Sequence, residues 1–451
     1  MTVAHSAADL EQELAELPVL DVHTHLCGGK LAARGLHDVL LDPLGVSDLY
    51  SAGCPRGTRL SQFPDWPSRE EAHQRIEEAL PFLLRVANTS TGWGVRIILR
   101  DLYDWHEPIT SANWERLDDL IRERSSDDAW ARSVLSRVNI RRSCTEHSRR
   151  GLGQDDDVLQ YSLEWGLFMR TRPGEFDTAV YELERTWGRP PEAPAPVCSA
   201  LRPPTYRVIR TLDDVHGAIR HYIRTIPYAE VIATAASFST DIDYRQPSDS
   251  EMEAALERRA TAGLTERNIY AAYIGEAFLA ALETRGTDIV LQFSLGAEAL
   301  PVETASRVRQ KTLAQLAEIV GRHPHLRFQC FLSSRHANQT LCSLCRELPN
   351  LSLAGFGAHN FFPDTIRQVF AERLDMVPIN KQVGFFSDAY SVEWAYAKAI
   401  IVRKQMAHVF AEKIAQGQYD REQALWVARE LLFESPQSLL RMTPEHGQLR
   451  G

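Results

Sequence analysis

The sequence alternates short apolar runs with amphipathic segments along most of its length, and this alternation limits the possible fold more than any other feature. The runs are short enough to be strands, and segments with helical periodicity separate most of them. Near-continuous apolar strands that alternate with helices predict a parallel sheet covered by helices. We expect strands at 19–25, 138–147, 157–163, 230–236, 288–295, 326–332, 351–357 and 383–387.

About eight strand–helix units favour an α/β protein with a TIM-like (β/α)8 barrel. Helical stretches that follow one another between residues 70 and 132 predict a helical insertion, bounded at 53–135, after the first βα unit. All 451 residues are then expected to form a single barrel domain, 1–451, that contains this insertion. Outside the insertion, helices are expected at 6–16, 36–50, 211–224, 249–285, 304–321, 338–347, 363–374, 391–415 and 421–433.

The composition argues against several classes of partner. A formal net charge of −10 does not suit binding to nucleic acid or to an anionic membrane. The sequence contains no run of about 18 apolar residues, so we expect no membrane span. The N-terminus lacks a signal-peptide core and the seven cysteines are scattered, so we expect a cytoplasmic protein without disulfides. Cys342 and Cys345 are better explained as buried thiols on a helix than as half of a zinc ribbon. Assembly into a homo-oligomer stays open.

Polar residues stand at the ends of the predicted strands. In a (β/α)8 barrel the reactive side chains lie at the C-terminal ends of the strands. This rule gives candidates from several strands, and they are His23, His25, Glu146, His147, Ser294, Arg335, His336, His359 and Asp388.

The first and last predicted strands end in residues that suit a metal ion. Alternate side chains of a strand share a face, so His23 and His25 are expected to point the same way. Asp388 ends the last strand, which is the neighbour of the first strand in a closed barrel. Two imidazoles and one carboxylate can hold a divalent metal with positions left open for substrate. The simpler alternatives are two chance histidines in a loop and, for Asp388, a cap for the helix that begins near Val392.

At these positions the chain resembles the amidohydrolase superfamily, and within it the uronate (glucuronate) isomerase family. The segment Asp21–Leu26 is similar to the family's Asp-Tyr-His-Cys-His-Leu first strand, and Asp388–Tyr390 to its Asp-Ser-Arg triplet. Gln292–Gly296 is similar to its Gln-Leu-His-x-Gly pattern, and Cys144–His147 to its Cys-Thr-Thr-Asp-Asp stretch. The resemblance runs from about residue 17 to 440 and implies a metal-dependent barrel with the helical insertion.

The chain departs from the family pattern around the substrate. Tyr390 replaces the arginine of the triplet, Ser294 replaces a histidine, and Glu146 with His147 replaces an acidic pair. In the family these positions help to hold the carboxylate and hydroxyls of a uronate. The metal residues are therefore kept while the substrate contacts differ, which leaves another sugar acid or another reaction open.

The resemblance implies an aldose–ketose isomerase, an intramolecular oxidoreductase that acts on a uronate or a related sugar acid by proton transfer. The alternative is another mononuclear enzyme of the superfamily, a hydrolase or decarboxylase, on a small carboxylated or carbohydrate-derived substrate. A barrel that keeps its metal only for binding is a third possibility. In the superfamily, two-metal hydrolases need a bridging lysine and histidines on the strands in the middle of the barrel. The strands at 230–236, 288–295 and 326–332 contain neither lysine nor histidine. We therefore expect one divalent metal. Zinc is the first choice, with manganese or iron as alternatives.

The resemblance also suggests roles for single residues. Asp388 would be a metal ligand and a proton shuttle, and Tyr390 would donate to a developing oxyanion. Arg335 would clamp the substrate carboxylate, with a surface arginine as the alternative. His359 would carry a proton or contact the substrate, with a structural histidine as the alternative. The remaining substrate contacts are expected from Glu146, His147 and Ser294.

Overall fold

A computed structural model gives the fold of the chain. It describes residues 3–55, 60, 67–146, 157–162, 165, 183–184, 187, 207–225, 232–238, 245–286, 288–295, 308, 310–356 and 362–442. The predicted site residues His147 and His359 lie outside these described residues.

Eight strands in the described residues form two parallel sheets. The first sheet has the order β1-β2-β3 and the second the order β4-β5-β6-β7-β8, and every pair within them is parallel. This arrangement confirms the α/β class and the parallel strands that the apolar runs predict. The strands are β1 Val19–Thr24, β2 Ile140–Glu146, β3 Leu159–Ser162, β4 Ile232–Phe238, β5 Val290–Leu295, β6 Arg327–Leu332, β7 Leu351–Ala354 and β8 Gln382–Val383.

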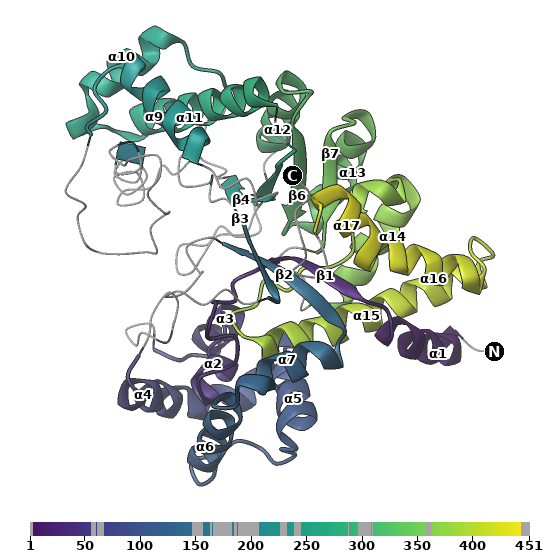
Figure 1. Ribbon diagram of the computed structural model, residues 1–451. Helices are drawn as coiled ribbons and strands as arrows, with labels where there is room; N and C mark the ends of the chain where they lie inside the picture. Colours follow the sequence, from purple (N-terminus) through teal and green to yellow (C-terminus); the bar gives the residue numbers. More distant parts are fainter. Residues whose placement is uncertain are drawn as a thin grey trace.

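Helices surround both sheets, and Figure 1 shows α2–α7 gathered on one side of the β1–β2 pair. No helix of the described part of the chain is long and apolar enough to cross a membrane. The helices are α1 Val3–Ala15, α2 Leu36–Leu40, α3 Pro43–Ser51, α4 Arg69–Ala79, α5 Ser90–Tyr103, α6 Trp114–Ser125, α7 Asp128–Arg137, α9 Leu212–Thr225, α10 Asp249–Glu257, α11 Leu264–Arg285, α12 Gln310–Arg322, α13 Asn338–Glu347, α14 Pro363–Met376, α15 Val392–Ala415, α16 Arg421–Arg429 and α17 Ser435–Leu440.

Two predicted helices are each divided in the structure. The helix expected at 36–50 ends at Leu40 and a new one starts at Pro43, because Asp42 accepts a hydrogen bond from Leu44 N and caps α3. The helix expected at 249–285 is divided into α10 and α11, and Gly263 precedes the second of them. The sequence did not reveal these breaks, because the apolar residues on the two sides of each break follow the same helical periodicity.

The last strand is shorter than predicted, and the chain after it pairs with β1. A strand was expected over 383–387, but β8 covers only Gln382 and Val383. Further on, Asp388 N donates to His23 O at 3.0 Å and His25 N donates to Ala389 O at 2.9 Å. These bonds join the first sheet to the end of the second, as a closed barrel requires. Complete closure and the single-domain organisation stay predictions.

A buried carboxylate connects the long helix α15 to the helices between β1 and β2. Glu393 is fully buried and accepts hydrogen bonds from Ala33 N at 2.8 Å, from the Tyr103 hydroxyl at 3.0 Å and from Trp130 Nε1 at 2.9 Å. Burial raises the pKa of Glu393, and the three donors oppose that shift. One side chain thus holds together α15, α5, α7 and the segment that precedes α2.

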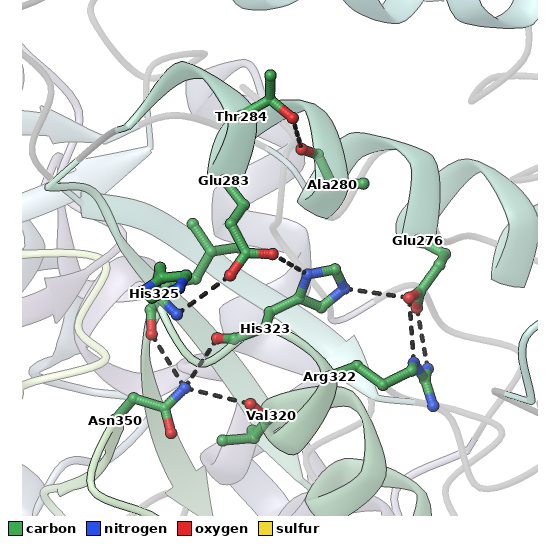
Figure 2. A network of polar contacts seen from close by, with 10 residues as sticks. Glu276, Ala280, Glu283, Thr284, Val320, Arg322, His323, His325 and Asn350 are labelled. Carbon is green, nitrogen blue, oxygen red and sulfur yellow. Dashed lines mark hydrogen bonds and ion pairs between the residues drawn. The ribbon is translucent and has the colours of Figure 1, made fainter.

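A second polar network ties α11 to the end of α12 (Figure 2). Both ring nitrogens of His323 face carboxylates, at 3.1 Å from Glu276 and 2.9 Å from Glu283, and the protonated imidazole donates to both. Arg322 donates twice to Glu276, at 3.0 and 2.9 Å. Burial lowers the pKa of His323, but the hydrogen bonds to the two glutamates outweigh it, and the net pKa lies above 6.5. The pKa of Glu276 is lowered to about 2, because these partners outweigh the effect of burial.

Replacement of Glu393 should destabilise the protein in proportion to the donors left without an acceptor. Glu393→Gln keeps one acceptor oxygen and should cost about 1 kcal/mol, whereas Glu393→Ala should cost about 3–5 kcal/mol. Urea unfolding followed by tryptophan fluorescence measures both. The exposed Glu412 on the same helix gives the control Glu412→Gln, which should leave stability unchanged. Equal stability of the Ala and Gln variants would contradict this account.

The histidine network should make stability depend on pH. The pKa of His323 is raised in the folded protein. Its contribution to the free energy of unfolding is therefore complete below pH 6.5 and is lost as the pH rises through the folded-state pKa. Glu276 contributes to stability above pH 4.5, and that contribution is lost as the pH falls toward 2. Urea midpoints measured from pH 5 to 9 should fall at the alkaline end in the wild type, and less steeply in His323→Gln. The exposed His325→Gln is the matched control, and a slope that persists in His323→Gln would refute the assignment.

Candidate metal centre

Strand β1 has one extra residue between Asp21 and Thr24, the stretch that contains His23. Asp21 pairs with Ser143 and Thr24 pairs with Thr145, so three steps along β1 match two steps along β2. This irregularity is a β-bulge, and it transfers the side chains beyond it to the opposite face of the strand.

The bulge puts both histidines on the face that the preceding apolar residues occupy. Val22 belongs to an apolar cluster with Phe331 and Phe386. The His23 ring lies 5.1 Å from the Phe331 ring and 5.9 Å from the Phe386 ring, measured between centroids. The two imidazole centroids are 5.0 Å apart, so His25 faces the same space as His23.

Asp388 brings its carboxylate to both imidazoles. Its Oδ1 lies 3.1 Å from His25 Nε2 and 3.7 Å from His23 Nε2. One ligand atom from each of the three residues lies within 4.8 Å of the others. Ligands that each stand about 2 Å from a shared ion are about 3 Å apart, so this donor set fits one divalent ion. Ser391, and not Asp388, is the cap residue of α15.

The carboxylate of Asp388 is kept ionised by its surroundings. Burial alone would raise its pKa. The hydrogen bond with His25 and the positive charges of His25, Lys398 and His23 outweigh burial and hold the pKa of Asp388 far below its ordinary value. A carboxylate must be deprotonated to bind a metal, and Asp388 meets this condition throughout the neutral range.

Tyr390 and Glu146 flank His25 from two sides. The Tyr390 ring is stacked on the imidazole at 4.6 Å between centroids, with an angle of 13° between the planes. Glu146 Oε2 lies 3.9 Å from His25 Nδ1, the ring nitrogen that does not face Asp388. The structure therefore brings one predicted catalytic residue, Tyr390, and one predicted substrate contact, Glu146, next to the predicted metal residues.

Ser294 lies on the face of β5 that points toward β1. Gln292, two residues earlier on the same face, donates to Val22 O at 3.3 Å and to Gln329 Oε1 at 3.0 Å. Ser294 is half-buried and pairs in the sheet with Phe331, the neighbour of His23. This position is compatible with the predicted contact to substrate.

Arg335 stands apart from the other predicted residues. It begins the 3-10 turn Arg335–Ala337 after β6, its side chain is exposed, and its Nη1 donates to Gln368 Oε1 at 2.7 Å. Within the described residues no hydrogen bond or ion pair connects it to His23, His25 or Asp388. Its proposed role as a carboxylate clamp stays a prediction.

The carboxylate of Asp21 supports β1 from its other face, and it was not among the predicted site residues. The backbone N–H and the hydroxyl of Ser387 donate to Asp21 at 2.8 and 2.6 Å. The Ser387 hydroxyl also lies 2.9 Å from Thr24 Oγ1, and Thr24 donates to Ala389 O at 3.0 Å. Burial raises the pKa of Asp21 to about 6, although its hydrogen bonds oppose this shift. An acidic residue inside an apolar run was the signal that could have revealed it.

Two further buried charges near the site were also missed. Lys398 on α15 donates through Nζ to Asp388 O at 2.7 Å. Asp42 is buried at the start of α3, and the charges of Lys398, Asp388 and His25 all act on it. A lysine inside a long helix is normally exposed, so no pattern in the sequence distinguishes Lys398 from its neighbours.

Comparisons with known proteins place the fold. The chain matches no protein-family model and no curated protein sequence. Its structure is similar to uronate isomerase from Thermotoga maritima, with a TM-score of 0.73, 14% identity and 97% of each chain covered. Glucuronate isomerase from Caulobacter crescentus has a TM-score of 0.70 at 16% identity, covering 97% of this chain and 94% of that one.

Two further similarities are more distant. Uronate isomerase from Bacillus halodurans has a TM-score of 0.65 at 16% identity, with 98% of each chain covered. A protein from Lactobacillus casei that was proposed to be a metal-dependent hydrolase has a TM-score of 0.55 at 12% identity, covering 96% of this chain and 97% of that one. The chain therefore shares its fold with uronate isomerases over nearly its full length, which confirms, at the level of the fold, the resemblance that its motifs indicate.

Proposed function

We propose that the protein is a metal-dependent isomerase that interconverts the aldose and ketose forms of a uronate or a related sugar acid. The proposal rests on one observation. Ligand atoms of His23, His25 and Asp388 lie within 4.8 Å of one another, on a fold shared with uronate isomerases. The same fold supports an amidohydrolase-type (β/α)8 barrel of one domain, with residues 53–135 as an insertion. The hydrogen bonds from β1 to Asp388 and Ala389 support closure of that barrel.

One divalent ion, with zinc as the first choice, would be held by His23, His25 and Asp388. A bound divalent ion supplies Lewis acidity, which polarises a substrate oxygen. The chain's own contribution is to fix the ligands. Tyr390 supports the His25 ring by stacking, and Glu146 lies beside the second nitrogen of that ring.

The proton transfers are assigned to residues around the ligand set. In the reaction a proton leaves the carbon next to the carbonyl and returns to the neighbouring carbon. The low pKa of Asp388 makes it a weak base for a carbon-bound proton, so its proton-shuttle role would be confined to hydroxyl protons. Tyr390 would donate its hydroxyl to the developing oxyanion, and His359 would carry the carbon-bound proton.

The substrate carboxylate and hydroxyls need contacts of their own. Glu146 and Ser294 would meet the hydroxyls, together with His147. Arg335 would hold the carboxylate in place of the arginine that Tyr390 replaces, because its planar guanidinium matches two oxygens. This contact requires Arg335 to exchange its bond with Gln368 for one with substrate.

A hydrolase or decarboxylase on a small carboxylated or carbohydrate-derived substrate is the second candidate. The observation in its favour is the similarity to the Lactobacillus casei protein that was proposed to be a metal-dependent hydrolase. A set of assays separates the two candidates. Ketose formation from a panel of uronates supports the isomerase, whereas ester or amide cleavage, or release of carbon dioxide, without ketose formation supports the second candidate.

Loss of either imidazole should remove most of the bound metal. We expect one equivalent of divalent metal in the wild type, and much less than one in His23→Ala or His25→Ala, because two ligands hold an ion far more weakly than three. Inductively coupled plasma mass spectrometry after dialysis measures the content. The exposed His106, paired with Asp104, gives the control His106→Ala. A full equivalent in the double variant His23→Ala/His25→Ala would refute the site.

Substitutions at Tyr390 and Arg335 should affect different kinetic constants. Tyr390→Phe removes a donor to the transition state and should lower kcat about tenfold or more with little change in KM. Arg335→Met removes a charge-assisted hydrogen bond worth about 1–3 kcal/mol and should raise KM about 5- to 150-fold.

The exposed Arg346 on α13 gives a control for loss of surface charge. Arg346→Met should leave both constants unchanged in steady-state assays on the uronate with the highest activity. An unchanged KM in Arg335→Met would show that another group holds the carboxylate. An unchanged kcat in Tyr390→Phe would show that the tyrosine acts only through its ring.

A further inference from the structure

The backbone of Asp388 has an unusual conformation for a metal ligand. Its φ is 49°, in the left-handed region that side chains other than glycine rarely adopt. The other non-glycine residues with positive φ in the described part of the chain follow the ends of helices α5, α7 and α17, where this conformation is common, and they are Asp104, Asn139 and Arg441. Asp388 is different because it lies between the last strand and α15.

Two hydrogen bonds hold the main chain of Asp388 from opposite sides. Its N–H donates to His23 O at 3.0 Å, so β1 fixes one peptide unit. Its carbonyl accepts from Lys398 Nζ at 2.7 Å, so α15 fixes the next one. Together these contacts determine the direction in which the carboxylate leaves the backbone.

The buried position of Lys398 is energetically unfavourable for a charged side chain. Its side chain is 2% exposed, and burial of an ammonium group is unfavourable without partners. Asp42 is a second buried charge in this region, and the described residues include no ion pair between it and Lys398. It is 5% exposed, its Oδ1 caps α3 at 3.2 Å from Leu44 N, and its buried Oδ2 has no hydrogen-bond partner among the described residues. The positive charge of Lys398 acts on this carboxylate.

We propose that Lys398 is a positioning residue of the metal centre, which holds Asp388 in the left-handed conformation through its carbonyl and so aims the carboxylate at His23 and His25. The inference rests on the proposed metal site. It assigns Lys398 no contact with substrate and no proton transfer.

The sign of the effect on metal affinity separates this role from a purely electrostatic one. An ammonium group near a cation site repels the cation, so a lysine that acted only as a nearby charge would weaken metal binding, and its removal would strengthen it. A lysine that positions a ligand strengthens binding, and its removal weakens it. Loss of a group that orients a metal ligand typically lowers metal affinity 10- to 100-fold.

The experiment compares Lys398→Met with Lys413→Met. Lys413 is also a buried lysine of α15, but it donates to Asp375 on α14 at 2.5 Å and has no contact with Asp388 among the described residues. Zn²⁺ affinity is measured by competition with a chromophoric chelator, and folding by circular dichroism and thermal unfolding. Lys398→Met should bind Zn²⁺ 10- to 100-fold more weakly than the wild type, whereas Lys413→Met should lose stability and keep the wild-type affinity.

Lys398→Gln gives a second variant with a polar, uncharged side chain, in case the methionine variant does not fold. It should bind Zn²⁺ more weakly than the wild type as well. Unchanged or tighter binding in a folded variant overturns the positioning role, and so does failure of both variants to fold, because Lys398 would then serve the fold itself. A wild-type protein that binds no Zn²⁺, Mn²⁺ or Fe²⁺ refutes the proposed function instead.

Discussion

The candidate metal centre depends on the pairing between β1 and the chain that follows β8. Asp388 N donates to His23 O and His25 N donates to Ala389 O, so each segment that carries the candidate ligands is the hydrogen-bond partner of the other. The ligands are therefore brought together by backbone bonds, before any ion contributes. Thr24 adds a side-chain bond to Ala389 O, and Asp21 adds two to Ser387. Because these groups are buried, loss of one partner would leave polar atoms unsatisfied.

Apolar packing beneath the ligands limits how far they can move. Phe331 and Phe386 lie 4.5 Å apart between ring centroids and both touch His23. Gly355, at the end of β7, has a φ of 44°, and a Cβ there would overlap the Phe386 ring. A side chain at 355 would thus displace Phe386 and, through it, His23, the first of the candidate metal ligands. The glycine is required both by its backbone conformation and by this close approach.

Local patterns were enough to predict most of the elements and the three ligand candidates. The His-x-His sequence and the aspartate after the last apolar run are visible because strand alternation and strand ends follow simple rules. The bulge in β1, the left-handed Asp388 and the ammonium of Lys398 were not visible, because each depends on contacts between residues that are far apart in the chain. For Arg335, the position in the chain could be predicted but the contact of the side chain could not. Its position after β6 was correctly predicted, but its side chain contacts Gln368 on α14, and no sequence pattern fixes a long exposed side chain.

The replacement of the family's arginine by Tyr390 changes how an anionic substrate can be held. The described carboxylates around the two imidazoles are Asp388, Glu146 and Asp42, and the ammonium of Lys398 is occupied by a main-chain carbonyl. Tyr390 offers a ring to His25 and a neutral hydroxyl, and neither neutralises a carboxylate. A sugar acid would therefore depend for positive charge on the bound ion and, in the role proposed for it, on Arg335. An arginine at position 390 would add a contact that is independent of the ion, whereas a tyrosine leaves more of the attraction to the ion itself. To the extent that the ion attracts the anion, each ligand raises the affinity for the other by the same factor.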